Sequence, residues 1–118
     1  MSSTIRTARV YEDVGDNDGA RVLVDRLWPR GMRKDDPRVG TWFPDAAPST
    51  ELRRWYQHEV DRFVEFAERY RGELTDEASD AVDHLAEMAA AGPITLTTAS
   101  KDLEHSEAAV LAEVLRRR

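Results

Sequence analysis

The chain has 118 residues, of which 41% are hydrophobic and 34% are charged, and it contains no cysteine. This length and apolar share predict one domain over residues 1–118 and exclude extensive disorder. The absence of cysteine excludes disulfides, thiol nucleophiles and thiolate metal sites, and the net charge of −6 disfavours a generally basic nucleic-acid-binding protein.

The sequence shows no sign of a membrane or secretion segment. No apolar run approaches the roughly 20 residues that a membrane-spanning helix needs. The first residues, Met1 to Arg6, lack the apolar region of a signal peptide. We therefore expect a cytoplasmic protein without a membrane partner.

Two short strands are expected in the N-terminal part of the chain. The first covers Ile5 to Tyr11. Residues 15–19, Gly-Asp-Asn-Asp-Gly, predict a turn because glycine adopts positive φ angles easily. The continuous apolar run of residues 22–24 then predicts a strand that is covered on both faces, as in a parallel sheet.

Residues 29–48 predict a long irregular connection. Four of the five prolines of the chain lie here, at positions 29, 37, 44 and 48. Proline removes a backbone donor and fixes φ, which excludes a long regular element. A connection of this length is unusual in a compact domain and often carries function. Trp42 and Phe43 are expected to fix it to the core.

Three helical patterns follow the connection. Ser49 is placed to cap the first helix, which carries Leu52, Trp55 and Tyr56 on one side. The second helix begins near Asp61. The third covers about residues 76–91, and the Gly-Pro pair at residues 92 and 93 ends it.

A β-branched strand and a last helix complete the chain. The strand covers residues 94–98 and the helix about residues 103–115, with Asp102 as its expected N-cap. The long helical crossover between the second and third strands predicts that these two strands lie parallel in one sheet. We expect an α/β fold: a small three-layer, Rossmann-like domain with a short, mainly parallel sheet flanked by helices.

Candidate site residues lie on the two loops that follow these parallel strands. Ligands of open parallel sheets bind beyond the carboxyl ends of the strands, so residues 25–31 and 99–105 are expected to open on the same edge. The candidates on these loops are Asp25, Arg26, Arg30, Ser100, Lys101, Asp102 and His105.

The charge pattern of the first loop predicts an anion- or phosphate-accepting cleft. Residues 26–38 carry five basic and two acidic side chains in an otherwise acidic chain. Guanidinium groups suit phosphate and carboxylate, and the N-terminus of the last helix adds backbone donors. The predicted ligand-binding residues are Arg26, Arg30, Ser100, Lys101 and His105. Two alternatives stay open: Asp25 and Arg26 simply pair within the structure, or the arginines are solvated or bridge local carboxylates.

Catalysis is a further hypothesis for this edge, with Asp25, Asp102 and His105 as candidates. His105 is expected in the first turn of the last helix, where the helix dipole favours the neutral imidazole that acts as a base. A surface histidine is the alternative. His58 and His84 are expected to be structural or solvent-facing.

The sequence identifies no metal site and no cofactor. No pair of histidines has the spacing of metal ligands, and the chain has no dinucleotide fingerprint and no glycine-rich phosphate loop. A nucleophile-elbow motif is absent as well.

The string Val-Leu-Val-Asp-Arg-Leu-Trp-Pro-Arg-Gly at residues 22–31 resembles the hallmark of the DUF488 family, in its short, YeaO-like branch. Matches at residues 47–53, 69–74 and 101–105 extend the resemblance over nearly the whole chain. It implies a small α/β fold of uncharacterised function and supports the candidate residues on the two loops. The family commonly has an aromatic residue at the place of Thr98 and asparagine at the place of Ser106, which implies a different specificity if these positions shape a pocket.

Three functions remain open from the sequence. The first is a small-molecule site for an anionic ligand, catalytic or not. The second is a nucleic-acid-binding or regulatory module that uses the arginines together with Trp28 or Trp42. The third is a non-catalytic interaction domain that forms a homodimer through its aromatic-rich first two helices.

Overall fold

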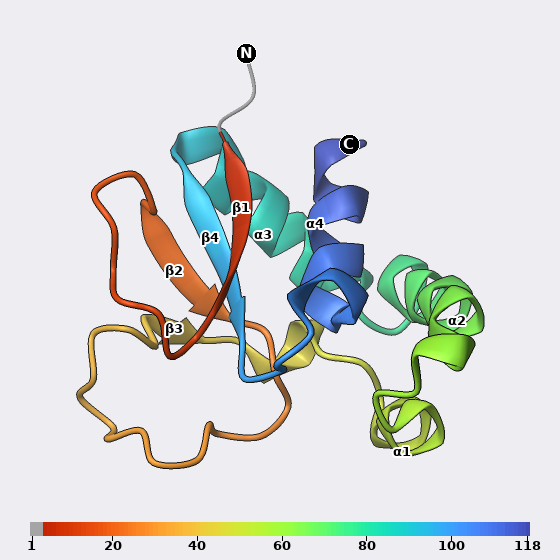
Figure 1. Cartoon of the computed structure of the whole chain (residues 1–118). Helices are drawn as coiled ribbons and strands as arrows, with labels where there is room; N and C mark the ends of the chain where they lie inside the picture. Colours follow the sequence, from red (N-terminus) through yellow and green to blue (C-terminus); the bar gives the residue numbers. More distant parts are fainter. Residues whose placement is uncertain (1–3) are drawn as a thin grey trace.

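A four-stranded parallel sheet forms the centre of the computed structural model, which describes residues 4–118 (Figure 1). Residues 1–3, the start of the segment compared above with a signal peptide, lie outside the described residues. The strands are β1 (Ile5–Arg9), β2 (Ala20–Leu23), β3 (Thr41–Trp42) and β4 (Ile94–Thr98), in the order β1-β4-β2-β3. The predicted α/β class is confirmed, and so is the parallel pairing of β2 with β4.

Four α-helices and three short 3-10 helices complete the described fold. The α-helices are α1 (Thr50–Tyr56), α2 (Phe63–Thr75), α3 (Ser79–Ala91) and α4 (Glu107–Arg116). The 3-10 helices are η1 (Pro44–Ala46), η2 (Val60–Arg62) and η3 (Leu103–His105). Among residues 4–118, no helix combines the length and the apolar character that crossing a membrane requires.

The two faces of the sheet are covered differently. On one face, Val22, Val24 and Leu96 pack into the main core together with buried residues of the helices. On the other face, Leu23 packs with Val10 and with buried residues of the long connection. The continuous apolar run at residues 22–24 is explained by this double burial. Helices cover one face, and the irregular connection covers the other (Figure 1).

Two details of the connection differ from expectation. The strand β3 was not predicted, because two residues are too few to produce a recognisable pattern. Trp42 was expected in the core but is 41% exposed, because it lies on this edge strand; only Phe43 packs against the core. The indole Nε1 of Trp42 donates a hydrogen bond to the carbonyl of Asp25 at 2.8 Å.

The helix caps confirm one prediction and correct another. Ser49 caps α1, as predicted, and its hydroxyl accepts a hydrogen bond from the amide of Leu52. The expected cap of the last helix, Asp102, is wrong. Residues 103–105 form η3, and Ser106 takes the cap position of α4 because its extended backbone lets its hydroxyl accept from the amide of Ala109.

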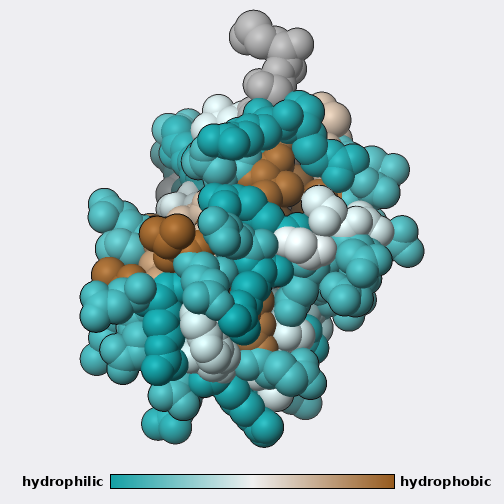
Figure 2. Space-filling model, turned by 90° about the vertical axis from the view of Figure 1, so that its right-hand side faces the viewer, coloured by the Kyte–Doolittle hydropathy of each residue, from teal (hydrophilic) through white to brown (hydrophobic). Residues whose placement is uncertain are grey.

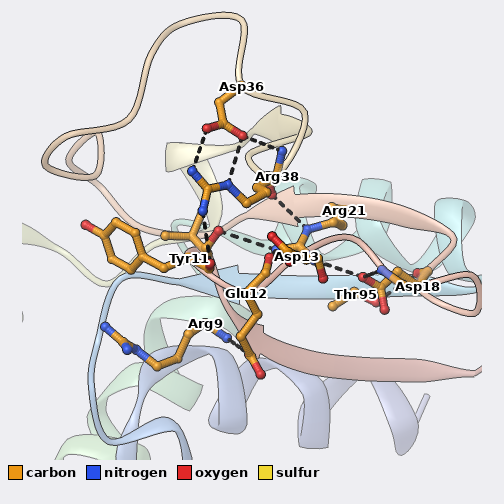
Figure 3. A network of polar contacts seen from close by, with 11 residues as sticks. Arg9, Tyr11, Glu12, Asp13, Asp18, Arg21, Asp36, Arg38 and Thr95 are labelled. Atoms are coloured by element: carbon orange, nitrogen blue, oxygen red, sulfur yellow. Dashed lines mark hydrogen bonds and ion pairs between the residues drawn. The ribbon is translucent and has the colours of Figure 1, made fainter.

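A buried guanidinium group ties β2 to the loops around it (Figure 3). Arg21 is 5% exposed, and its Nε donates to the carbonyl of Arg38 at 2.8 Å. Its remaining nitrogens donate to the carbonyl of Glu12 at 3.0 Å and to the carboxylate of Asp18 at 2.8 Å. A charge that is removed from water is stable only when it is paired and hydrogen-bonded in this way.

Arg38 is itself held by an acidic neighbour. Its guanidinium contacts both carboxylate oxygens of Asp36, at 3.1 and 2.8 Å, and donates to the carbonyl of Tyr11 at 3.1 Å. The side-chain hydrogen bond from Arg38 lowers the pKa of Asp36 to about 2. Arg38, one of the basic residues of the predicted anion-binding segment, therefore serves the fold.

We predict that replacing Arg21 by methionine lowers the free energy of unfolding by about 3–5 kcal/mol, because Asp18 and several carbonyls lose their partner. Urea denaturation monitored by circular dichroism measures this change. Arg33→Met is the matched control, since the Arg33–Asp35 pair is exposed, and it is expected to change stability by no more than about 0.5 kcal/mol. Equal effects of the two substitutions would contradict the structural role of Arg21.

Candidate functional site

A cavity of about 470 Å³ lies at the carboxyl ends of β2 and β4. Residues from both predicted loops line it, among them Asp25, Arg30 and Ser100. The expectation that the two loops open on the same edge of the sheet is thus confirmed. In Figure 1, the carboxyl ends of β2 and β4 point to the lower side of the molecule, where α1 also lies.

The lining changes in character from its buried to its exposed residues. The inner residues are polar: Asp25, Thr98 and Glu107. The walls are mainly apolar and include Trp28, Pro29, Pro48, Tyr56 and Phe66. The most exposed polar residues are Arg30, Arg53 and His58, which form the outer part of the cavity.

Three side chains from three elements meet at the inner end. Asp25 follows β2, Thr98 ends β4, and Glu107 begins α4. The hydroxyl of Thr98 lies 2.7 Å from Oδ1 of Asp25 and 2.7 Å from Oε1 of Glu107. The other oxygen of Asp25 accepts a hydrogen bond from the amide of Ala99 at 2.8 Å. We call Asp25, Thr98 and Glu107 the inner cluster.

Proton counting assigns a proton to this inner cluster. A threonine hydroxyl has one hydrogen, so it donates to only one of the two carboxyl groups beside it. The second short contact is a hydrogen bond only when the other carboxyl group carries a proton of its own. Asp25 already accepts from the amide of Ala99, whereas burial disfavours the charged form of Glu107, and the proton therefore lies on Glu107.

The electrostatics of Glu107 agree with this assignment. Burial raises the pKa of Glu107 well above its usual range, and the hydrogen bond and negative charge of Asp25 raise it further. The inner cluster is then a carboxylic acid beside a carboxylate, with one negative charge in total. Pairs of this kind donate and accept hydrogen bonds from adjacent atoms.

The predicted site residues fall into two groups. Asp25, Arg26, Arg30 and Ser100 line the cavity. Arg26 and Asp25 form no ion pair within residues 4–118, which excludes the alternative that they neutralise each other. Nε of Arg26 instead donates to the carbonyl of Pro48 at 3.0 Å, so this guanidinium anchors the long connection.

The second group, Lys101, Asp102 and His105, is not part of the cavity lining. Oδ2 of Asp102 accepts a hydrogen bond from Nδ1 of His105 at 2.8 Å, and the rings of His105 and Phe63 form a T-shaped pair. His105 belongs to η3 and not to the first turn of α4, so the expected effect of the helix dipole on it is wrong. The ligand-binding and catalytic roles of these three residues stay predictions.

The N-terminus of the last helix also differs from expectation. Ser100 and Lys101 were expected directly before it, but α4 begins only at Glu107. Its first amides are met by protein groups: the hydroxyl of Ser106 accepts from the amide of Ala109. Ser100 and Lys101 therefore do not adjoin the N-terminus of α4, and their predicted role in ligand binding stays a prediction without that helix end.

Several cavity residues were missed by sequence reasoning. The sequence predicted Glu107 only as part of the last helix, and Arg53 and Tyr56 only as part of the first helix. One signal was present: Glu107 lies four residues before Leu111, on the same helical stripe as the buried positions 108, 111, 112 and 115. A carboxyl group on an apolar stripe indicates either a buried polar contact or a site.

A second cavity of about 750 Å³ lies against η1, α1 and the facing ends of α2 and α3. Its acidic lining includes Asp45, Glu51, Glu73, Glu77 and Asp80. Such a lining disfavours an anion. Within residues 4–118, no group of three histidine, aspartate or glutamate side chains is placed to hold a metal ion.

Comparisons with known proteins identify relatives along the whole chain. The family model described as "Inactive DUF488-N3 subclade" matches residues 4–118. The chain is 53% identical over 111 residues to the uncharacterised protein Rv3073c of Mycobacterium tuberculosis, which covers 94% of this chain and 92% of that protein. It is 40% identical over 112 residues to the uncharacterised protein YeaO of Escherichia coli, covering 95% and 96% of the two chains. No solved structure matches the chain.

We predict that Glu107 makes stability depend on pH. A carboxyl group with a raised pKa in the folded state stabilises the fold fully below its unfolded value, here 4.5, and this contribution is lost as the pH rises through the folded pKa. Relative to Glu107→Gln, the wild type is expected to lose up to about 1.4 kcal/mol of unfolding free energy per pH unit above pH 4.5.

Urea denaturation of both proteins at pH 5, 6 and 7 measures the difference. Glu113→Gln is a suitable control, because it removes a carboxyl group from the same helix. The partner of that carboxyl group, Arg117, is exposed. A constant difference between the wild type and Glu107→Gln across this range would contradict a protonated Glu107.

Proposed function

The chain belongs to the DUF488 family, in the subclade described as inactive, and we propose that it binds a small anionic ligand in the cavity of the inner cluster without converting it. The description of the subclade favours binding over turnover. The volume of about 470 Å³ falls within the roughly 300–1,000 Å³ that small-molecule sites occupy.

The observation that carries this proposal is a pair of arginines in the outer part of the cavity. Arg30 comes from the loop after β2 and Arg53 from α1, and both are exposed. Neither guanidinium has a hydrogen-bond or ion-pair partner within residues 4–118. Two such groups on separate elements suit one phosphate or carboxylate, to which guanidinium donates in a bidentate way.

The same structure disfavours the nucleic-acid alternative. Of the basic residues in segment 26–38, Arg26 is bound to backbone carbonyls, Arg33 pairs with Asp35, and Arg38 pairs with Asp36. Trp28 and Trp42 pack edge to face, with ring centroids 5.6 Å apart, so each covers part of the ring surface of the other. Little of the basic segment is left for a phosphate backbone.

The interaction-domain alternative finds limited support in the surface of the helices. Val60 and Val64 are exposed there, at 51% and 73%. Figure 2 shows this side of the molecule as mainly hydrophilic, with hydrophobic residues in separate small patches. Stable interfaces need a larger continuous apolar area. A homodimer therefore stays a prediction. The cytoplasmic location expected from the sequence stays a prediction as well.

We predict that phenyl phosphate and benzoate bind to the wild-type protein and raise its melting temperature. Arg30→Ala and Arg53→Ala are each expected to weaken binding by about tenfold, because a charge-assisted hydrogen bond is lost. Isothermal titration calorimetry measures the affinities, and thermal melts report the stabilisation.

Arg33→Ala is the control, since Arg33 lies on the same loop but outside the cavity, and it is expected to bind like the wild type. If neither probe binds, or if all three arginine variants behave alike, the proposal is wrong. Binding of an oligonucleotide that weakens steeply with salt would support the nucleic-acid alternative instead.

A further inference from the structure

The inner end of the cavity has the opposite charge preference from its outer part. We propose that the ligand is bifunctional: its anionic group stays at Arg30 and Arg53, and an amine, amidine or guanidine nitrogen at its other end donates hydrogen bonds to the inner cluster. This inference rests on the proposed function and adds the chemical class of the ligand.

The free valences of Asp25 support this orientation. Each of its carboxylate oxygens has one protein partner, Thr98 for Oδ1 and the amide of Ala99 for Oδ2. A carboxylate oxygen accepts about two hydrogen bonds. Of the two further acceptor positions of Asp25, the hydrogen bond with Glu107 takes one, and because Asp25 lines the cavity, a ligand donor reaches the other.

Glu107 adds a second polar atom beside Asp25. Its Oε1 lies 2.7 Å from the hydroxyl of Thr98, and its carboxyl group is also hydrogen-bonded to Asp25. The side chain lines the cavity. Two adjacent carboxyl groups have more acceptor positions than these contacts occupy, so they suit a ligand with two geminal nitrogens, such as an amidine.

An anion at this end is disfavoured for the same reason. The inner cluster carries one negative charge, and its surroundings are mainly apolar side chains with a low effective dielectric. A second negative charge there would face repulsion. The guanidinium of Arg26, which also lines the cavity, directs two of its nitrogens to the carbonyls of Pro48 and Ala47, so it has fewer donors left for an anion than Arg30 and Arg53 have. The cavity thus rejects ligands with anionic groups at both ends.

The walls between the two ends favour an apolar, planar middle part. Tyr56 stacks on Phe66 with ring centroids 4.2 Å apart, and its hydroxyl donates to the carbonyl of His105. The indole nitrogen of Trp28 donates to the carbonyl of Met32. Because their polar atoms already have protein partners, these side chains present only ring surface to a ligand.

Three para-substituted benzoates test the proposal, each titrated calorimetrically into the intact wild-type protein at pH 7. Benzoate has only the anionic group, 4-amidinobenzoate adds a nitrogen donor, and terephthalate adds a second anion. We expect 4-amidinobenzoate to bind at least tenfold tighter than benzoate, and terephthalate to bind more weakly than benzoate.

Two variants assign the effects to the two ends of the cavity. Arg30→Ala is expected to weaken benzoate and 4-amidinobenzoate by the same factor, which leaves their ratio unchanged. Asp25→Asn removes the inner negative charge and is expected to reduce that ratio to about threefold or less. If Asp25→Asn does not fold, as judged by circular dichroism, the order of the three ligands on the wild type decides.

The possible failures are distinct. If none of the three benzoates binds, the bifunctional ligand is excluded, and if phenyl phosphate does not bind either, the proposed function is wrong as well. If benzoate binds but 4-amidinobenzoate is no tighter, or terephthalate is the tightest, the anion-binding function stands and the bifunctional ligand is excluded.

Discussion

The burial of the Arg21 guanidinium is the constraint on which the irregular half of the molecule depends. A cation on a covered sheet face has to be surrounded by acceptors, and the chain supplies them from the turn before β2 and from the long connection after it. These contacts hold residues 24–40, which form no helix or strand, against the sheet. The loop that carries Asp25 and Arg30 leaves β2 within this framework, so the position of the cavity follows from it.

The inner cluster is a second point where distant parts of the chain are joined by polar contacts. Asp25 follows β2, Thr98 ends β4 and Glu107 begins α4. The hydroxyl of Thr98 contacts both carboxyl groups. The proton on Glu107 leaves the pair with one negative charge, which lets two carboxyl groups lie side by side without an ion-paired cation. Arg30 and Arg53 lie in the outer part of the same cavity, whereas Arg26, which also lines it, is bound to backbone carbonyls, and this arrangement gives the cavity a direction.

The parts of the fold that could be predicted are those with local or periodic signals. The apolar run at residues 22–24 indicated a doubly covered strand, and the cap at Ser49 followed from its hydroxyl and position. The start of the last helix was missed because Asp102 and Ser106 are both good caps, and the choice between them depends on where β4 delivers the chain. Glu107 was missed because its contacts are made with Thr98, 9 residues earlier in the chain, and through it with Asp25 on the loop after β2, which no local pattern records.

The edges of the sheet have a consequence for the behaviour of the protein in a crowded solution. β3 pairs over only two residues, too few to serve as a template for another strand. On the opposite edge, Arg116 donates to the carbonyl of Ile5, and Glu12 accepts from the amide of Arg9. Both borders of the sheet are thereby blunted against strand addition, which protects an otherwise regular parallel sheet from edge-to-edge aggregation.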